Sequence, residues 1–229
     1  MEEEIIYSKY SDHPEVLTLV GDYCSLLKRE FFNGLRISTP REEMDLRISS
    51  YEKSNIGLHD GLWTSATLIS GMKRKSLLTL SFKEIICEYL VGFSEKEFVF
   101  FSKNCDKGYF TTKNLNTYKL FYKKAKNDLE KSVSKRESII LPSSEDFFIT
   151  KDENFYVLEF LARSKKRAEE YFNLNGEEPI KFGLINKKLV NSSTQTVLNQ
   201  VWFSSIESGS KLSGNRNLKY IGNLRCMKK

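Results

Sequence analysis

Residue types that could support acid–base catalysis are few in this chain. Its two histidines are His13 and His59, and imidazole is the side chain that most readily exchanges protons near neutral pH. His13 precedes an expected helix start and is predicted to cap it, while His59 lies between glycines in 57–61 and is predicted to occupy a turn. The sequence has no G-x-S-x-G motif. We therefore assign no catalytic residue, and the sequence leaves open whether the chain is an enzyme.

The carboxylates and thiols do not form a recognisable ligand set. Asp146, Asp152 and Glu159 flank an expected hairpin, but position 161, where a metal-dependent nuclease would carry a lysine, is Leu161. These carboxylates are predicted to face solvent. The cysteines lack C-x-x-C spacing, which disfavours a zinc site or a disulfide framework: Cys24, Cys87, Cys105 and Cys226. Neither G-x-x-x-x-G-K-[ST] nor G-x-G-x-x-G occurs, so no metal and no cofactor are predicted.

The net positive charge of the chain lies in residues 208–229. The whole chain has 36 Lys+Arg and 30 Asp+Glu, which gives +6, and no acidic residue follows Glu207. Six basic residues lie in this tail, so the 207 residues before it are neutral overall. A local field of one sign attracts partners of the other sign. The tail therefore indicates either contact with nucleic acid, a phosphoinositide headgroup or an acidic protein, or only a solvated surface.

We expect the partner contact in this tail to be made by basic side chains and one aromatic ring: Lys211, Arg216, Lys219, Tyr220 and Arg225. Arginine presents two parallel donors to a phosphate or carboxylate. Tyr220 is expected either to stack on a base of a single strand or to be buried in a closing strand. The predicted partner is nucleic acid or an acidic protein surface.

A second basic stretch lies at 103–136, where ten basic residues accompany three acidic ones. Lysine dominates this stretch, and Arg136 is its one arginine. Because arginine is preferred for bidentate phosphate contacts, these lysines are predicted to form a solvated surface.

The elements that must position these residues begin with two predicted helices. Pro14 suits a first helical turn and Gly34 an exit, and the apolar stripe between them predicts a helix over 14–33. Thr39-Pro40-Arg41-Glu42 has the form of a capping box and predicts a second helix to about Ser54.

The chain start gives an expectation about location. Met1 to Glu4 is acidic, unlike the basic start of a signal peptide, and no apolar run approaches the roughly 18 residues of a membrane helix. A cytoplasmic protein with reduced thiols is expected.

From residue 62 the pattern favours strands. They are expected over 62–69, 77–82, 96–102, 108–112, 117–123, 138–141, 146–151 and 154–161, the last two forming a hairpin. A short helix over 81–91 is an alternative to the end of the strand expected at 77–82. Beyond them we expect a helix at 164–172, a strand at 180–185, a helix from Ser193 that aligns Val197, Leu198, Val201 and Trp202, and a last strand at 218–221.

Residues 84–174 resemble a bacterial pleckstrin-homology-like (PH-like) domain. The resemblance lies in Glu84-Ile85-Ile86, in Lys107–Leu115, which matches a strand ending in a turn, in the strand Ser138–Leu141, and in the hairpin 146–160 leading to a closing helix at 164–172. Asn114 departs from the family pattern, which has a basic residue there, and 118–136 is longer than the usual connection. The resemblance implies a small barrel that binds a partner and carries no catalytic residues.

A second resemblance is to ADP-ribosyltransferase-like proteins. Asp106–Thr112, followed by Tyr118 and Phe121, is similar to their middle motif, and Asn199–Phe203 would be the strand of their third motif, with Gln200 in its polar position. His59 is the one candidate for the first motif. The resemblance implies NAD-dependent chemistry with His59, Tyr109 and Gln200 in one cleft, and it requires a strand at 196–203 where periodicity favours a helix.

Together these observations predict an α+β protein with three parts: a helical N-terminal segment (1–70), a β-rich PH-like barrel (71–175) and a small α/β basic C-terminal segment (176–229). The expected function is non-enzymatic binding of an anionic partner, as an adaptor or regulator. The alternative is an NAD-dependent ADP-ribosyltransferase. Oligomeric state does not follow from the sequence.

Overall fold

The computed structural model describes residues 5–7, 16–23, 35–51, 61–71, 75–80, 110–112, 115–185, 196–204 and 211–228. Its strands are β1 (Ile5–Tyr7), β2 (Val16–Gly21), β3 (Leu35–Ile37), β4 (Leu62–Gly71), β5 (Leu77–Thr79), β6 (Phe110–Thr112), β7 (Ser138–Ile140), β8 (Phe147–Ile149), β9 (Ile180–Gly183), β10 (Thr196–Phe203), β11 (Lys211–Ser213) and β12 (Gly222–Lys228). Its helices are α2 (Pro40–Tyr51), α5 (Leu115–Asn127), α6 (Phe155–Ala162) and α7 (Lys165–Leu174), with a 3-10 turn, η3, at Val133–Lys135.

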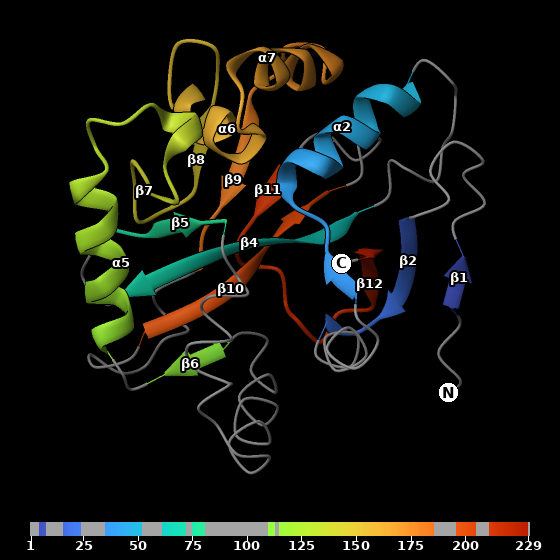
Figure 1. Ribbon diagram of the computed structural model, residues 1–229, viewed down its shortest axis with the longest axis horizontal. Helices are drawn as coiled ribbons and strands as arrows, with labels where there is room; N and C mark the ends of the chain where they lie inside the picture. The colour runs from blue at the N-terminus through green and yellow to red at the C-terminus, as the bar shows by residue number, and fades with distance from the viewer. Residues whose placement is uncertain are drawn as a thin grey trace.

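The described strands form one curled, mostly antiparallel sheet, ordered β1-β2-β12-β4-β10-β11-β9-β8 (Figure 1). Short strands extend it: β3 pairs with β12, β6 with β10, and β5 with both β4 and β7. Two pairs are parallel, β12 with β4 and β11 with β9. The most extensive strand pairing joins β4 to β10, so these two strands form the centre of the sheet, on which the other elements lie.

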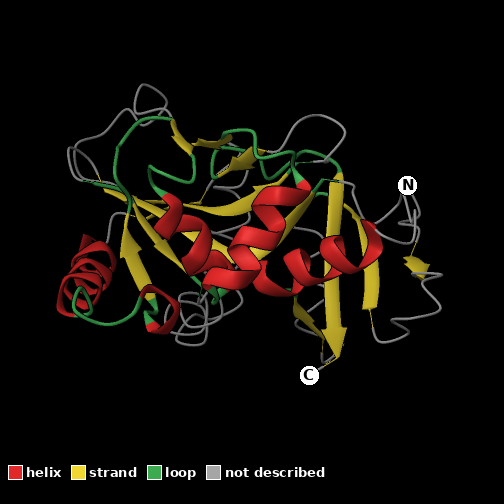
Figure 2. Cartoon of the chain, turned by 90° about the horizontal axis from the view of Figure 1, so that it is seen from above, coloured by secondary structure: helices red, strands yellow, loops and turns green. Residues whose placement is uncertain are grey.

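The helices cover the sheet unevenly. α2, α6 and α7 lie together over one face, with α2 packed against both of the others, whereas α5 lies at the end of the sheet beside β5 and β7 (Figure 2). Consecutive side chains of β10 alternate between two apolar clusters: Val197, Val201 and Phe203 belong to the cluster beneath the three helices, and Leu198 and Trp202 to a second, aromatic one. All eight residues of β10 are buried for this reason.

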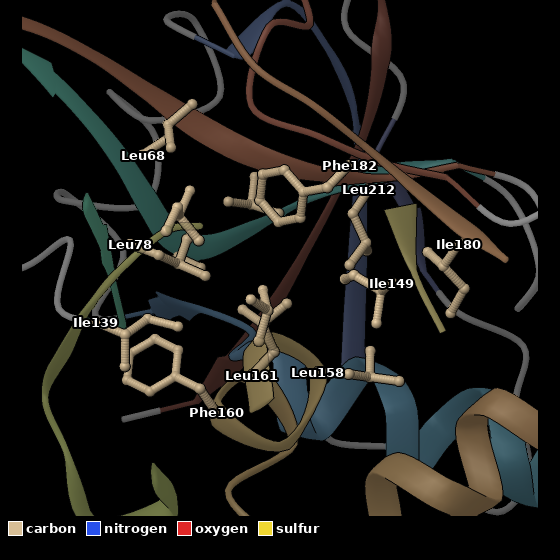
Figure 3. Packing of buried hydrophobic residues seen from close by; sticks show 14 of the residues in the cluster. Leu68, Leu78, Ile139, Ile149, Leu158, Phe160, Leu161, Ile180, Phe182 and Leu212 are labelled. Carbon is tan, nitrogen blue, oxygen red and sulfur yellow. The ribbon is translucent and has the colours of Figure 1, made fainter. Parts of the chain in front are cut away.

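The cluster beneath α2, α6 and α7 is the larger core. Figure 3 shows side chains from β4, β5, β7, β8, β9, β11 and α6 meeting in it, among them Leu68, Phe160 and Phe182. The rings of Phe147 and Phe182 stack at 5.2 Å between the neighbouring strands β8 and β9. Burial of these side chains holds the helical layer on the sheet, because each buried large apolar side chain contributes about 1.5–3 kcal/mol.

Local signals explain the starts of two helices. At α2 the Oγ1 of Thr39 accepts from the backbone N–H of Glu42 (3.3 Å), and the Glu42 carboxylate accepts from the backbone N–H of Thr39 (2.8 Å). This is the reciprocal capping box that the sequence predicted. At α7 the Ser164 hydroxyl accepts from the backbone N–H of Arg167 (3.3 Å). The predictions of α2 and α7 are therefore confirmed, with α2 described over Pro40–Tyr51.

The predicted helical N-terminal segment is wrong, and so is the α+β description built on it. Residues 16–21, placed in a helix over 14–33, form β2, which pairs with β1 and β12. The run Val16-Leu17-Thr18-Leu19-Val20 has high strand propensity, and its sheet partners outweigh the helical spacing. The fold is a mixed α/β structure in which strands from the N-terminal, middle and C-terminal parts are neighbours in one sheet.

Four further predicted elements are wrong. The strand expected at 117–123 is the helix α5, the strand expected at 154–161 is α6, and the helix expected from Ser193 is the strand β10. Consequently the 146–160 hairpin of a PH-like barrel is absent from the described residues: β8 pairs with β9, and a helix follows it. The last strand is β12 rather than 218–221, which includes a turn.

Strands expected near 62–69, 77–82, 108–112, 138–141, 146–151 and 180–185 are confirmed as β4, β5, β6, β7, β8 and β9. The strand expected at 96–102 lies outside the described residues, as does the alternative helix over 81–91. The proposed boundaries at 70 and 175 remain predictions.

Candidate anion-binding surface

The candidate surface is built where β10 ends and the chain returns through β11 to β12. Trp202 and Phe203 of β10 pair with Ser213 and Leu212 of β11. Ser213 lies on the same face of the sheet as Trp202, because cross-strand partners share a face. Lys211 is two residues from Ser213 along the strand, so its side chain lies on that face too. Residues 214–221, hereafter the 214–221 loop, then connect β11 to β12.

The backbone of this loop is held to neighbouring parts of the fold at three points. Gly214 donates its N–H to the carbonyl of Gly183 (2.8 Å), and the Asn199 side-chain amide donates to the carbonyl of Arg216 (3.0 Å). The carbonyl of Leu218, whose side chain is fully buried, accepts from the N–H of Tyr23 (2.9 Å). These contacts fix the backbone that carries Arg216, Lys219 and Tyr220, so the loop is organised before any partner binds.

Aromatic rings support the Arg216 side chain. Its guanidinium carbon lies 4.8 Å from the ring centroid of Trp202 and 3.8 Å from that of Tyr220. Trp202 packs edge-to-face on Trp63, with ring centroids 4.7 Å apart, so the lower part of this stack is continuous with the aromatic core. Such a cation–π contact contributes about 0.5–2 kcal/mol and holds the guanidinium plane in one orientation.

Two glycines make room for the stack. A Cβ atom at Gly61 would lie 2.4 Å from the Trp202 ring, and one at Gly222 would lie 2.7 Å from it. The side-chain amide of Asn223 donates to the carbonyl of Gly61 (3.3 Å), joining β12 to the residue that precedes β4. Close approach of backbone to the indole is therefore what permits the tryptophan to lie under Arg216.

The outer side of the surface is polar and basic. Lys211 and Lys219 are exposed, Arg216 is half-buried, and Tyr220 keeps 54% of its surface exposed. Hereafter the aromatic–basic surface means Lys211, Arg216, Lys219 and Tyr220. A guanidinium whose π-face is stacked on rings still has N–H groups at its edge that can donate to an oxyanion. The arrangement can therefore bind phosphate or carboxylate groups beside a flat aromatic ring.

Arg225, the fifth residue of the predicted binding set, lies elsewhere. Its side chain is 2% exposed and forms an ion pair with Glu43, which is 0% exposed. The hydroxyl of Ser38 donates to the other carboxylate oxygen of Glu43 (2.5 Å). Arg225 thus joins β12 to α2 inside the protein, and it does not contribute to the exposed surface.

Sequence reasoning missed Trp202 as the support for Arg216. It assigned Trp202 to the apolar face of a helix, and the sequence carries no local signal that joins positions 202 and 216. The alternative that Tyr220 is buried in a closing strand is wrong, because Tyr220 is 54% exposed and lies in a turn in which its N–H donates to the carbonyl of Asn217 (3.0 Å).

The residues of the ADP-ribosyltransferase resemblance are only partly described. The strand that it requires at 196–203 is present as β10. Gln200 is fully buried, however, and its amide group lies 3.2 Å from the Oγ1 of Thr67 within the sheet. His59 and Tyr109 lie outside the described residues. In this position Gln200 stabilises the β4–β10 contact.

Among the carboxylates considered for metal binding, Asp146 has partners within the fold. Asp146 accepts from the N–H of Leu184 (2.8 Å) and pairs with Lys181 (3.0 Å). Burial raises the pKa of the Asp146 carboxyl, but these two contacts outweigh it and the net pKa is lowered. Within the described ranges no group of three or more His, Cys, Asp or Glu side chains could hold a metal ion. Of the four cysteines the structure describes Cys226, which is buried in β12.

In comparisons with known proteins, no family model, no curated protein and no solved structure matches this chain. Among the helices that the structure describes, none is long and apolar enough to cross a membrane.

Proposed function

We propose that this chain is a nucleic-acid-binding protein that uses the aromatic–basic surface to hold phosphates beside an unpaired base. The observation that carries the proposal is the Arg216 guanidinium lying 3.8 Å from the ring centroid of Tyr220 in a loop fixed to the sheet. Arginine and an exposed aromatic ring together supply the two contacts, phosphate and base stacking, that single strands offer.

Positive charge alone does not distinguish a nucleic acid from an acidic protein as the partner, and the Tyr220 ring provides the distinction. The exposed Lys211 and Lys219 would attract either partner. Tyr220 adds a flat surface with 54% of its area open, and stacking on such a ring contributes roughly 1–3 kcal/mol per base. An acidic peptide has no comparable use for it.

The number of basic groups sets the expected salt dependence. Three phosphate contacts, one for each basic residue of the surface, give a slope of about −2 in log affinity against log salt for a single strand. A slope much steeper than this would indicate that further basic residues of the chain take part.

The test is a titration of the purified chain with a fluorescent single-stranded oligonucleotide, the matching duplex and single-stranded RNA at two salt concentrations. Arg216→Gln and Tyr220→Ala are each expected to weaken single-strand binding about tenfold. Arg216→Gln should also reduce the salt slope by about 0.7, whereas Tyr220→Ala should leave it unchanged.

Two matched controls lie away from the loop. Lys166→Gln removes a lysine that is 87% exposed on α7, and Phe148→Ala removes an aromatic side chain that is 55% exposed on β8. Both should bind like wild type. The proposal is wrong if wild type binds no nucleic acid, or if the controls lose as much affinity as the loop variants. Binding of polyglutamate that depends on Arg216 but not on Tyr220 would point to an acidic protein instead.

A further inference from the structure

The outward face of α5 combines lysines with an exposed leucine. Tyr118, Phe121 and Ala125 point inward and are buried in the aromatic cluster. Lys119, Lys123 and Lys126 are exposed at helical spacings of four and three residues, and they form one stripe on the opposite side. Leu120, which is 51% exposed, lies beside that stripe. The inward and outward faces of α5 therefore have separate roles.

The inward face fixes the helix to the sheet. The hydroxyl of Tyr118 donates to the carbonyl of Lys75 (2.7 Å), and the ring lies over Gly71 of β4, where a Cβ atom would come within 2.8 Å of it. Because this face is committed to the core, α5 cannot turn to bury Leu120. The exposure of Leu120 is thus a property of the folded protein.

The segment after α5 presents a second exposed leucine. Leu129 is 56% exposed, and its carbonyl accepts from the Arg136 guanidinium, whose Nε also donates to the carbonyl of Lys131 (2.8 Å). Arg163 donates to the carbonyls of Ser134 and Arg136 and so ties this segment to α6. Leu129 is therefore held in the open by its own backbone contacts.

Charge near α5 is predominantly positive. Lys124 pairs with Glu137, and Lys131 pairs with Asp128 at 2.6 Å. Lys119, Lys123 and Lys126 form no ion pair with any residue that the structure describes. Their charge is available to an anionic surface, and the lysine ammonium suits a diffuse field of phosphates better than a bidentate contact.

From these observations we infer that the α5 face, meaning Lys119, Leu120, Lys123 and Lys126 with the neighbouring Leu129, rests on the surface of an anionic lipid bilayer. Lysines near such a surface are attracted by its negative potential, and the exposed Leu120 beside them can enter the acyl boundary while the ammonium groups stay at the headgroups. A nucleic acid would satisfy the lysines but would leave Leu120 exposed. This inference concerns a different surface from the aromatic–basic one and does not depend on it.

The experiment is co-sedimentation of the whole chain with vesicles of phosphatidylcholine alone or with about a third phosphatidylserine, at two salt concentrations. Wild type should bind the anionic vesicles and not the neutral ones. Replacing Lys119, Lys123 and Lys126 by Gln should weaken binding about fivefold per lysine, or roughly 100-fold together. Replacing Lys165 and Lys166 of α7 by Gln is the matched control and should change little.

Leu120→Gln separates lipid from nucleic acid without altering charge. It should reduce vesicle binding by several-fold and leave oligonucleotide binding unchanged, since only a bilayer accepts an apolar side chain. Thermal unfolding checks that each variant is folded. Arg216→Gln, which alters the aromatic–basic surface, should bind vesicles like wild type. The inference is overturned if wild type does not bind anionic vesicles, if Leu120→Gln binds them equally well, or if the lysine variant loses oligonucleotide binding instead.

Discussion

Two arginines nine positions apart in the basic tail occupy opposite environments. Arg225 is enclosed between β12 and α2 and pairs with Glu43, whereas Arg216 lies over Trp202 and Tyr220 at the edge of the protein. Charge counting along the sequence treats them alike. In the structure one charge is neutralised inside the fold, and the other is oriented by aromatic rings toward the outside. The difference shows that the charge of a basic tail does not give the charge of the protein surface, because some basic side chains pair with acidic ones inside the fold.

The same substitution at both sites should give the largest contrast. Arg225→Met leaves the buried Glu43 carboxylate without its ion-pair partner, which costs about 3–5 kcal/mol, whereas Arg216→Met removes only the cation–π contact, which contributes about 0.5–2 kcal/mol. Urea unfolding of the two variants measures the difference. Adding Glu43→Leu to Arg225→Met removes both charges and should restore much of the loss. If the double variant is no more stable than Arg225→Met, the pair is not what holds this region.

The next largest effect on stability is expected from a methyl group added at Gly222, beneath the stack of Trp202 and Arg216. At Gly222 a Cβ atom would lie 2.7 Å from Trp202 and 3.0 Å from Trp63, so Gly222→Ala should destabilise by about 1–3 kcal/mol through overpacking and shift the tryptophan fluorescence. Gly176→Ala is the comparison: its backbone has φ +70, and no atom lies within 4 Å of the added methyl. Gly176→Ala should lose stability through backbone strain alone, and its tryptophan fluorescence should be unchanged. Identical spectra for both would show that the rings have room to move.

Arg216→Lys sharpens the comparison between Arg216 and Arg225, because it keeps the positive charge at position 216 and removes the planar guanidinium. We expect single-strand affinity to fall about three- to tenfold, because an ammonium makes neither the bidentate contact nor the same stack. The salt slope should stay near the wild-type value since the charge is retained. Lys219→Arg is the reciprocal control and should not weaken binding. Wild-type affinity for Arg216→Lys would mean that Arg216 acts only through its charge.

The smallest effect is expected at the glutamate next to Glu43. The Glu42 carboxylate accepts two hydrogen bonds from Arg36, at 2.6 and 2.9 Å, near the protein surface. Burial raises its pKa, but the bonds from Arg36 and Thr39 outweigh burial, and the net pKa is lowered. A carboxyl with a lowered folded-state pKa contributes stability above its unfolded pKa, about 4.3, and that contribution is lost as pH falls through the folded value.

Stability measured between pH 6 and pH 3 should therefore fall by under about 1 kcal/mol on account of this pair, which is partly exposed. Glu42→Gln should remove that part of the pH dependence, and Glu130→Gln, on the exposed segment after α5, should not. An unchanged profile for Glu42→Gln would assign the acid sensitivity to other carboxyls.

Elements with local signals could be predicted from the sequence. The capping box at Thr39 and the Ser164 cap determine helix starts by contacts within four residues. α5 was also predictable, since Tyr118, Phe121, Tyr122 and Ala125 have helical spacing, but the aromatic residues led us to expect a strand. Here the signal was present and was interpreted wrongly.

Other elements depend on contacts that no local pattern records. β10 is buried on both faces, so it lacks the alternation that marks a strand, and its apolar residues fit a helix equally well. α6 is an eight-residue segment that is apolar except for Glu159, a length at which strand and helix cannot be distinguished. At the candidate surface, the sequence could indicate Arg216 and Tyr220, but neither the support from Trp202 nor the withdrawal of Arg225 into the core could be derived before the register of β10, β11 and β12 was known.

The position of β12 has a consequence for how the protein is made. This strand separates β2 from β4 and is the partner of β2, β3 and β4. During synthesis β2 has therefore been translated about 200 residues before the strand that connects it to the rest of the sheet, a delay of roughly 10–40 s at ordinary elongation rates. Until then the edge of β2 is open to other chains. We expect the nascent protein to depend on protection of this N-terminal segment, and its yield of folded product to be more sensitive to aggregation during translation than to its final stability.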